Sequence, residues 1–241
     1  MAARELESHG FFLMPLLLPG FDVLDAGCGP ATITAGIAGS VFPGRVTAID
    51  IAPAQVETAR RLTQGREIMN IDFVTASVNH LPFADHSFDV VFAHALLEHL
   101  PDPIAALKEL HRVTRPGGFI AVSSPDWDGS TLDPELALAM NAYRHLQERQ
   151  GAHPTAGTHL RDWLTKADFT PLVHDHWIEE YEDPRAIAED LAHQLENAGQ
   201  FHHARSFRQW AKGPESRFHQ SWKYATGVRA DDHRIHPGHQ E

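Results

Sequence analysis

Short apolar runs alternate with helical patterns along the first half of the chain. The runs predicted to form strands are Val23–Asp25, Arg45–Asp50, Asp72–Ser77, Phe88–Phe92 and Phe119–Pro125. Between them apolar residues recur at helical spacing, as in the inward stripe of Val56, Ala59 and Leu62 after Pro53. Strands that alternate with helices in this way form parallel sheets. The pattern predicts an α/β fold of the doubly wound, Rossmann-like kind, mostly parallel and with helices on both faces.

The second half of the chain is richer in helical patterns. Asp133 and Pro134 begin a helix that ends before Gly151. Further elements are predicted as a helix at Thr158–Ala167, a strand at Pro171–Ile178, two helices starting near Asp183 and Phe201, and a strand within Ser221–Arg229. The two helices between the last two strands form an insert.

A tight glycine turn follows the first predicted strand. Gly27 and Gly29 remove side chains where a ligand must approach the backbone, and the helix after them offers unpaired N–H groups. Asp50 ends the second strand, where a carboxylate can accept hydrogen bonds from both hydroxyls of a ribose. The segment therefore predicts a binding site for an adenosine derivative.

Composition and charge limit the kinds of partner that we expect the protein to bind. The 241 residues carry a formal net charge of −12, which argues against a large phosphate-binding surface and hence against a nucleic-acid partner. The most apolar run, Phe11–Pro19, is about half the length that a membrane span needs. Cys28 is the single cysteine, so no disulfide forms within the chain. We expect no membrane partner and a cytoplasmic location.

Two residues of the turn favour a cationic ligand over a dinucleotide. Thr32 stands where a dinucleotide fingerprint has its third glycine, and the carboxylate of Asp25 suits a cation better than a pyrophosphate. The segments VLDAGCGPATIT, AIDIAP, LPFADHSFDVVFAHALLEHLPDP and RPGGFIAV resemble the class I S-adenosylmethionine-dependent methyltransferases, in particular the branch of ubiquinone and menaquinone biosynthesis enzymes and small-molecule methyltransferases. The resemblance runs from about Leu17 to Val122, with the four motifs in the family's order and spacing.

The resemblance implies roles for the cofactor-binding residues. Asp25 and the Gly27 backbone would face the methionine part of S-adenosylmethionine, Asp50 the ribose and Ile51 one face of the adenine. The remaining residues that the resemblance places at the cofactor are Cys28, Gly29, Ser77, Val78 and His94. Ser77 departs from the family, which often has Asp there, and Ala31 replaces the usual third-position glycine. A serine hydroxyl still accepts a hydrogen bond, so we expect weaker adenine recognition.

The resemblance also implies a domain organisation with a seven-stranded sheet, whose last, antiparallel strand lies at the sheet edge. The helix after Asp133 is longer than the family core needs, and we expect it to be a lid that sets substrate specificity. The predicted parts are an N-terminal helical cover (1–20), the cofactor-binding core (21–129), the lid helix (130–157), the rest of the core with a helical insert (158–229) and a flexible tail (230–241).

Candidate catalytic and substrate residues follow from position. Ligands of open parallel sheets bind at the carboxyl ends of the strands, where the fourth strand leads into His94, Glu98 and His99. Of these, the imidazoles of His94 and His99 are the candidate general bases. Candidates for the substrate pocket are His9, Phe12, Asp126, Trp127 and Tyr143. No metal site is expected, because no ligand set completes the histidine pair of His174 and His176.

Methyl transfer from S-adenosylmethionine to an oxygen, nitrogen or carbon atom of a small molecule is the function that these motifs favour. Two alternatives stay open. One is a repurposed protein that binds the cofactor without methyl transfer, and the other is an NAD-linked oxidoreductase on the same half-fold. The sequence identifies neither the acceptor nor the oligomeric state.

Overall fold

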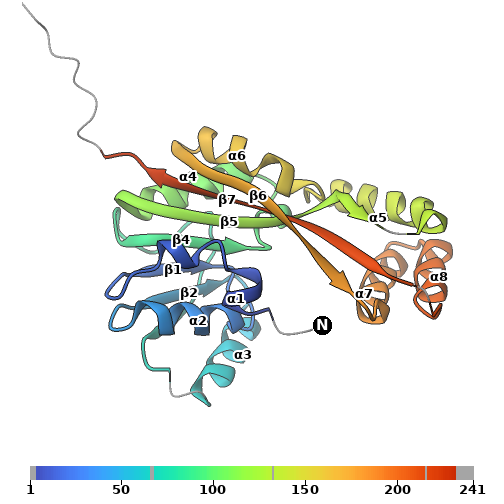
Figure 1. The fold of residues 1–241 in the computed structure, drawn as a ribbon, viewed down its shortest axis with the longest axis horizontal. Helices are drawn as coiled ribbons and strands as arrows, with labels where there is room; N and C mark the ends of the chain where they lie inside the picture. Colours follow the sequence, from blue (N-terminus) through green and yellow to red (C-terminus); the bar gives the residue numbers. More distant parts are fainter. Residues whose placement is uncertain (1–3, 66–67, 132, 215, 232–241) are drawn as a thin grey trace, which may run out of the picture.

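The computed structural model describes residues 4–65, 68–131, 133–214 and 216–231, and the predicted tail lies mostly outside this range. Seven strands form one sheet in the order β3-β2-β1-β4-β5-β7-β6 (Figure 1). Their bounds are β1 Val23–Ala26, β2 Val46–Asp50, β3 Ile71–Thr75, β4 Phe88–His94, β5 Thr114–Thr131, β6 Phe169–Tyr181 and β7 Phe218–Arg229. Only β7 runs antiparallel to its neighbours. The predicted doubly wound, mostly parallel seven-stranded sheet is therefore confirmed.

Helices cover both faces of this sheet. They are α1 Leu6–His9, α2 Thr32–Val41, α3 Pro53–Gln64, α4 Pro103–Val113, α5 Ala137–Arg149, α6 Ala156–Lys166, α7 Arg185–Asn197 and α8 Phe201–Trp210, with short 3₁₀ turns η1 Met14–Leu16, η2 Leu97–His99 and η3 Pro134–Leu136. Successive residues of β4 serve different cores: Val90 and Phe92 pack with α1 and α2, whereas Val91 and Ala93 pack with α4 and α6. The central strands are thus buried on both faces, as a parallel sheet requires.

The position of strand β7 in the sheet differs from the prediction. It lies between β5 and β6 and pairs with both along its length, so β6 is the edge strand and the prediction of β7 at the edge is wrong. The pairing also extends β5 beyond the predicted end at Pro125, because Asp126 pairs with Ser221 and Thr131 with His219. Asp126 and Trp127 consequently lie inside a strand and not at its carboxyl end.

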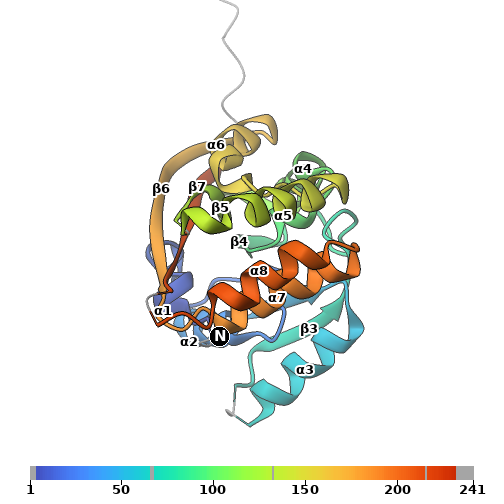
Figure 2. The same ribbon diagram turned by 90° about the vertical axis from the view of Figure 1, so that its right-hand side faces the viewer.

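The long strands β5, β6 and β7 carry a helical arm at one end (Figure 1, Figure 2). Helices α5, α7 and α8 form the arm and bury their own apolar core, which includes Tyr143, Leu195, Phe207 and Phe218. The arm has a hydrophobic cluster separate from those of the sheet, and it begins where β5 continues past Asp126. That α5 acts as a lid remains a prediction.

Candidate functional site

The glycine turn is pinned to the neighbouring strand. The N–H groups of Gly27 and Cys28 both donate to the carbonyl of Ile49, at 2.8 and 2.9 Å. Gly27 has φ +77°, and a Cβ atom there would lie 3.1 Å from Cδ1 of Leu96. Gly27 is therefore required twice, for a left-handed backbone and for the close approach of the segment after β4. Gly29 is left-handed too, with φ +51°.

Ala31 holds a glycine-like conformation without being glycine. Its φ of 61° is left-handed, which costs a residue with a Cβ atom about 1 kcal/mol. Its side chain is buried and packs with Ala48, Val56 and Phe73. The methyl group therefore gains contacts that offset part of the strain of the left-handed backbone.

Asp25 is a buried carboxylate behind the turn. Thr34 Oγ1, on α2, donates to its Oδ2 at 2.6 Å. The pKa of Asp25 is raised to about 6: burial is the largest influence, the Thr34 hydrogen bond opposes it, and the charge of Asp50 adds to it. A buried acid of this kind becomes a stronger binding group when a cation approaches it, because the cation favours the charged form.

Asp50 closes the turn from the other side. Its Oδ2 accepts the N–H of Gly29 at 3.1 Å and its Oδ1 accepts the N–H of Ala52 at 2.9 Å. The next side chain, Ile51, is 72% exposed and free to lie against a flat ligand. The thiol of Cys28 stays protonated at neutral pH and is no nucleophile, because burial first, and then the charges of Asp25 and Asp50, raise its pKa.

Ser77 and Val78 begin the loop after β3. Ser77 pairs with His80 in an isolated bridge, and its Oγ accepts the N–H of Asn79 at 3.3 Å. Val78 is buried in the core. The backbone of this loop is therefore fixed beside the carboxyl end of β3, where the adenine edge was expected.

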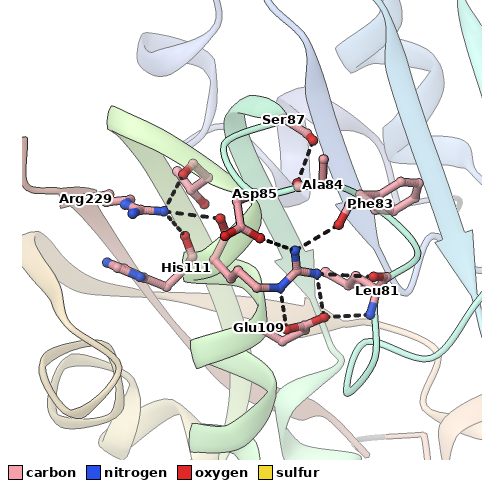
Figure 3. Close-up of polar contacts among 10 residues, drawn as sticks. Leu81, Phe83, Ala84, Asp85, Ser87, Glu109, His111 and Arg229 are labelled. Carbon is pink, nitrogen blue, oxygen red and sulfur yellow. Dashed lines mark hydrogen bonds and ion pairs between the residues drawn. The ribbon is translucent and has the colours of Figure 1, made fainter. Parts of the chain in front are cut away.

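Arg112, on α4, holds the same loop, whose residues Leu81, Phe83 and Asp85 appear in Figure 3 together with Glu109. Its guanidinium donates to the carbonyls of Leu81 and Phe83 at 3.2 and 2.8 Å, and to the carboxylate of Asp85 at 2.7 Å. Glu109 bridges them, since it accepts from Arg112 and also from the N–H of Leu81 at 2.8 Å. The sequence showed Glu109 and Arg112 only as a pair three residues apart on a helix, which does not reveal the loop contacts.

Arg229, at the end of β7, caps the same helix (Figure 3). It donates to the carbonyls of His111, Arg112 and Thr114, at 2.8, 3.2 and 2.8 Å. Carbonyls at a helix C-terminus lack intrahelical partners, and a cation there satisfies them. β7 thus fixes the end of α4 and, through Arg112, the loop of Ser77.

His94 ends β4 and is buried. Its Nδ1 shares a 2.6 Å hydrogen bond with Ser123 Oγ, and its ring stacks on Trp222 with centroids 4.9 Å apart. Burial, and then the positive charges of Arg4 and His9, lower the pKa of His94, so the ring is neutral at neutral pH. Its buried Nε2 has no hydrogen-bond partner within the described part of the chain.

The N-terminal segment brings His9 to this imidazole. The two rings meet edge to face at 5.6 Å. His9 Nδ1 bonds Ser8 Oγ at 2.8 Å, and its Nε2 lies 3.3 Å from Glu179 Oε1, an ion-pair distance without hydrogen-bond alignment. Phe12 lies deeper, stacked on Tyr224 at 4.6 Å. α1 therefore covers the end of β4, with His9 and not Phe12 next to His94.

Glu98 and His99 occupy η2, directly after β4. Glu98 is buried, accepts from Ser124 Oγ at 2.8 Å, and has its pKa raised by burial. The side chain of His99 is 64% exposed, and its Nε2 lies 3.8 Å from Glu98 Oε1. The sequence favoured His99 over Glu98 as a candidate general base. In the structure, Glu98 is the buried group at the carboxyl ends of the strands and His99 is largely exposed.

Trp127 and Tyr143 lie together, and Asp126 lies apart from them. The two rings meet edge to face at 5.5 Å, and both line a cavity of about 80 Å³ together with Glu98. Asp126 is buried in a 2.7 Å ion pair with Lys223 on β7. Asp126 is thus already partnered within the sheet.

A larger hollow lies elsewhere. An open hollow of about 670 Å³ lies around Trp210 and Pro134 in the helical arm, at the opposite end of the molecule from β1 in Figure 1. Its lining carries none of the candidate cofactor, catalytic or substrate residues. Size alone therefore does not identify the site.

Neither a metal cluster nor a membrane span is found where the structure describes the chain. No three His, Cys, Asp or Glu residues in the described ranges converge as metal ligands. His176 pairs with the neighbouring Asp175 at 3.3 Å, and His174 lies 3.3 Å from the carbonyl of Gly157. None of the helices within those same ranges is both long and apolar enough to cross a bilayer.

Comparisons with known proteins place the chain among methyltransferases. A family model described as a methyltransferase domain matches residues 24–122. A Schizosaccharomyces pombe protein named as an uncharacterized methyltransferase is 37% identical over 179 residues, which are 70% of this chain and 63% of that protein. A demethylmenaquinone methyltransferase of Clavibacter sepedonicus is 32% identical over 64% of this chain and 68% of its own length. For several relatives the match spans only 43% to 63% of the relative's length.

A solved structure shows the same fold. The crystal structure of a Bacillus halodurans protein assigned as a methyltransferase superposes with a TM-score of 0.71, over 93% of this chain and 99% of that one, at 15% identity. The family model lies on the turn, on both acids and on β4, the segments that build the site. The chain belongs to the class I S-adenosylmethionine-dependent methyltransferases.

Proposed function

We propose that this protein transfers a methyl group from S-adenosylmethionine to an oxygen, nitrogen or carbon atom of a small molecule. The observation that carries the proposal is the pair of acids on neighbouring strands, Asp25 and Asp50, on either side of a glycine turn. The net charge of −12 supports a small-molecule acceptor over nucleic acid, and a cytoplasmic location belongs to the same proposal.

The residues present fit the cofactor. The cradle at Gly27 and Gly29 leaves backbone open to a ligand, and a Cβ built on Gly29 meets nothing within 4 Å. In this proposal Asp25 holds the cationic methionine part and Asp50 accepts from the ribose hydroxyls. Ile51 covers the adenine, whose polar edge faces Ser77 and Val78.

The bound cofactor supplies an activated methyl group, so the protein mainly orients the acceptor and removes a proton where one must leave. We assign that proton transfer to His94. In the tautomer whose Nδ1–H donates to Ser123, the lone pair of His94 lies on the buried Nε2. Ser123 then acts as a positioning residue that holds the imidazole ring in place. His99, being largely exposed, is the second candidate base.

Calorimetric titration with S-adenosylmethionine and S-adenosylhomocysteine tests the proposal. We expect micromolar binding of both, and product S-adenosylhomocysteine with at least one member of a panel of small phenols, amines and carboxylic acids. No binding at millimolar ligand would refute it, and binding without turnover across the panel would favour the repurposed protein. Tighter binding of NAD would favour the oxidoreductase. The carboxylate of Asp25 argues against that function, because it would repel the pyrophosphate of NAD.

A further inference from the structure

The cavity beside Glu98 has the chemistry of a cation site. It measures about 80 Å³ and lies between η2, the distal part of β5, α5 and the loop that leads to α6. For comparison, a cavity of about 150 Å³ holds benzene, so this one holds a group of only a few heavy atoms. It accepts the polar end of a molecule, whose remainder must extend toward solvent or the cofactor.

A single buried carboxylate is the formally charged group in the cavity wall. Glu98 is held in place by the hydroxyl of Ser124 at 2.8 Å and by the N–H of His153, which donates to the Glu98 carbonyl at 2.7 Å. Neither lysine nor arginine is among the described residues that line the cavity. Among the described residues of the wall, the potential counter-ion is His99, whose side chain is 64% exposed and whose Nε2 lies 3.8 Å from Glu98 Oε1. A buried carboxylate without a close buried partner is costly, and a bound cation would relieve that cost.

The other walls suit an ammonium group as well. Trp127 and Tyr143 meet edge to face at 5.5 Å and present aromatic surface, which attracts cations. His153 also lines the cavity, and its buried Nε2 has no partner in the portion of the chain described. A neutral imidazole nitrogen can accept a hydrogen bond from an ammonium N–H.

We propose that this cavity binds the ammonium group of a small aliphatic amine acceptor, with Glu98 as its counter-ion and Trp127 and Tyr143 as its aromatic walls. The identification of this molecule as the methyl acceptor rests on the function proposed above. Because an ammonium nitrogen has no lone pair, the ammonium group in the cavity is the recognised group, and the methyl group goes to another nucleophilic atom of the same molecule. The binding site itself rests on the cavity. Burial raises the pKa of Glu98, and an ammonium ion in the cavity would lower it again.

Titration with n-propylammonium and n-propanol, which have the same number of heavy atoms, tests the site. The readout is the indole N–H signal of Trp127 in ¹⁵N-labelled full-length protein, assigned with a Trp127→Phe variant among the five tryptophans. We expect n-propylammonium to bind at least tenfold more tightly than n-propanol. Glu98→Gln, which can still accept from Ser124, should abolish this preference, whereas Glu57→Gln on the exposed face of α3 should keep it.

Equal affinity for the amine and the alcohol, or a preference that survives in Glu98→Gln, would overturn the proposal. The comparison in the unsubstituted protein decides the matter even if Glu98→Gln fails to fold. Calorimetry with S-adenosylhomocysteine on the same samples separates the two ideas. Absent cofactor binding with an intact amine preference refutes the methyl-transfer function alone, and the reverse result refutes the amine site alone.

Discussion

The ionisation of Asp25 should control cofactor binding. The cofactor's methionine part carries two positive charges, on its sulfonium and amino groups, so it should bind to the carboxylate form of Asp25 and not to the acid. In the free protein the pKa of Asp25 is about 6, because the side chain is buried and lies near Asp50. Binding should therefore release a proton near pH 6 and below, and affinity should rise with pH until Asp25 is ionised.

The size of the effect follows from that pKa. If only the ionised form binds, the affinity at pH 7 should exceed that at pH 5 by about tenfold, which is about 1.4 kcal/mol. In the unsubstituted protein, Thr34 Oγ1 lies 2.6 Å from the carboxylate of Asp25. Asp25→Asn keeps an oxygen that can accept this hydrogen bond and removes the charge. The variant should bind more weakly, and its affinity should lack this pH dependence.

The stability of the ligand-free protein should change with pH in the opposite direction to cofactor affinity: the contribution of Asp25 should fall as pH rises. A carboxyl whose pKa is raised from 3.8 to about 6 on folding stabilises the fold fully below pH 3.8, and this contribution is lost as pH rises through about 6. The difference corresponds to at most about 3 kcal/mol. Without ligand, Asp25→Asn should therefore gain stability relative to the unsubstituted protein between pH 4 and pH 7.

Calorimetry of S-adenosylmethionine in buffers of different ionisation enthalpy measures the proton release, and thermal melts across pH measure the stability change. Asp72→Asn is a matched control, because Asp72 is exposed on β3 in an ion pair with Arg45. A tenfold rise in affinity that persists in Asp25→Asn would assign the titration to another group, such as a histidine. That outcome would refute the role given to Asp25.

Three further predictions concern other parts of the site. Asp50→Asn should weaken S-adenosylhomocysteine binding about 100-fold, because charge-assisted hydrogen bonds contribute about 1.5–3 kcal/mol, and calorimetry showing unchanged affinity would contradict this. His94→Asn should lower kcat about 100-fold at unchanged cofactor affinity, and Ser123→Ala should shift the pH profile of kcat. If the variants lose only cofactor affinity, both residues have a structural role and no part in proton transfer. Arg112→Lys should reduce the free energy of unfolding by about 1–2 kcal/mol in urea titrations and weaken adenosine binding, and an unchanged midpoint would show that the loop needs no such anchor.

The local part of the site could be predicted from sequence. Gly27, Asp50 and the apolar runs around them are close in sequence, and their order encodes a strand, a turn and a helix. Whether β7 lies inside the sheet depends on hydrogen bonds with β5 and β6, each more than 30 residues away, and no local pattern specifies that choice. The same limit applies to Asp126, whose partner Lys223 lies on β7.

Glu98 shows a second kind of limit. Its position after β4 made it one of three ionisable groups to weigh, but imidazole chemistry favoured His94 and His99. Burial by elements that follow much later, α5 and the loop before α6, distinguishes the carboxylate from the exposed His99. Sequence can place a titratable residue at a strand end, whereas its desolvation depends on the tertiary fold.

The two departures from the family pattern now have physical accounts with different consequences. Ala31 adopts a left-handed backbone, which glycine adopts without strain, and packs its methyl group into a small core, so we expect the turn to keep its place beside the methionine part. Ser77 loses the carboxylate that would accept from adenine, but its loop is clamped by Arg112, which Arg229 and β7 support in turn. Because Arg112 fixes the loop at Leu81 and Phe83, we expect the N–H of Val78 to stay in place for a ring nitrogen although the side-chain contact is weaker. Recognition should therefore shift from the adenine toward the ribose and the methionine part, where Asp50 and Asp25 act, and analogues altered in the base should be tolerated better than analogues altered at the ribose.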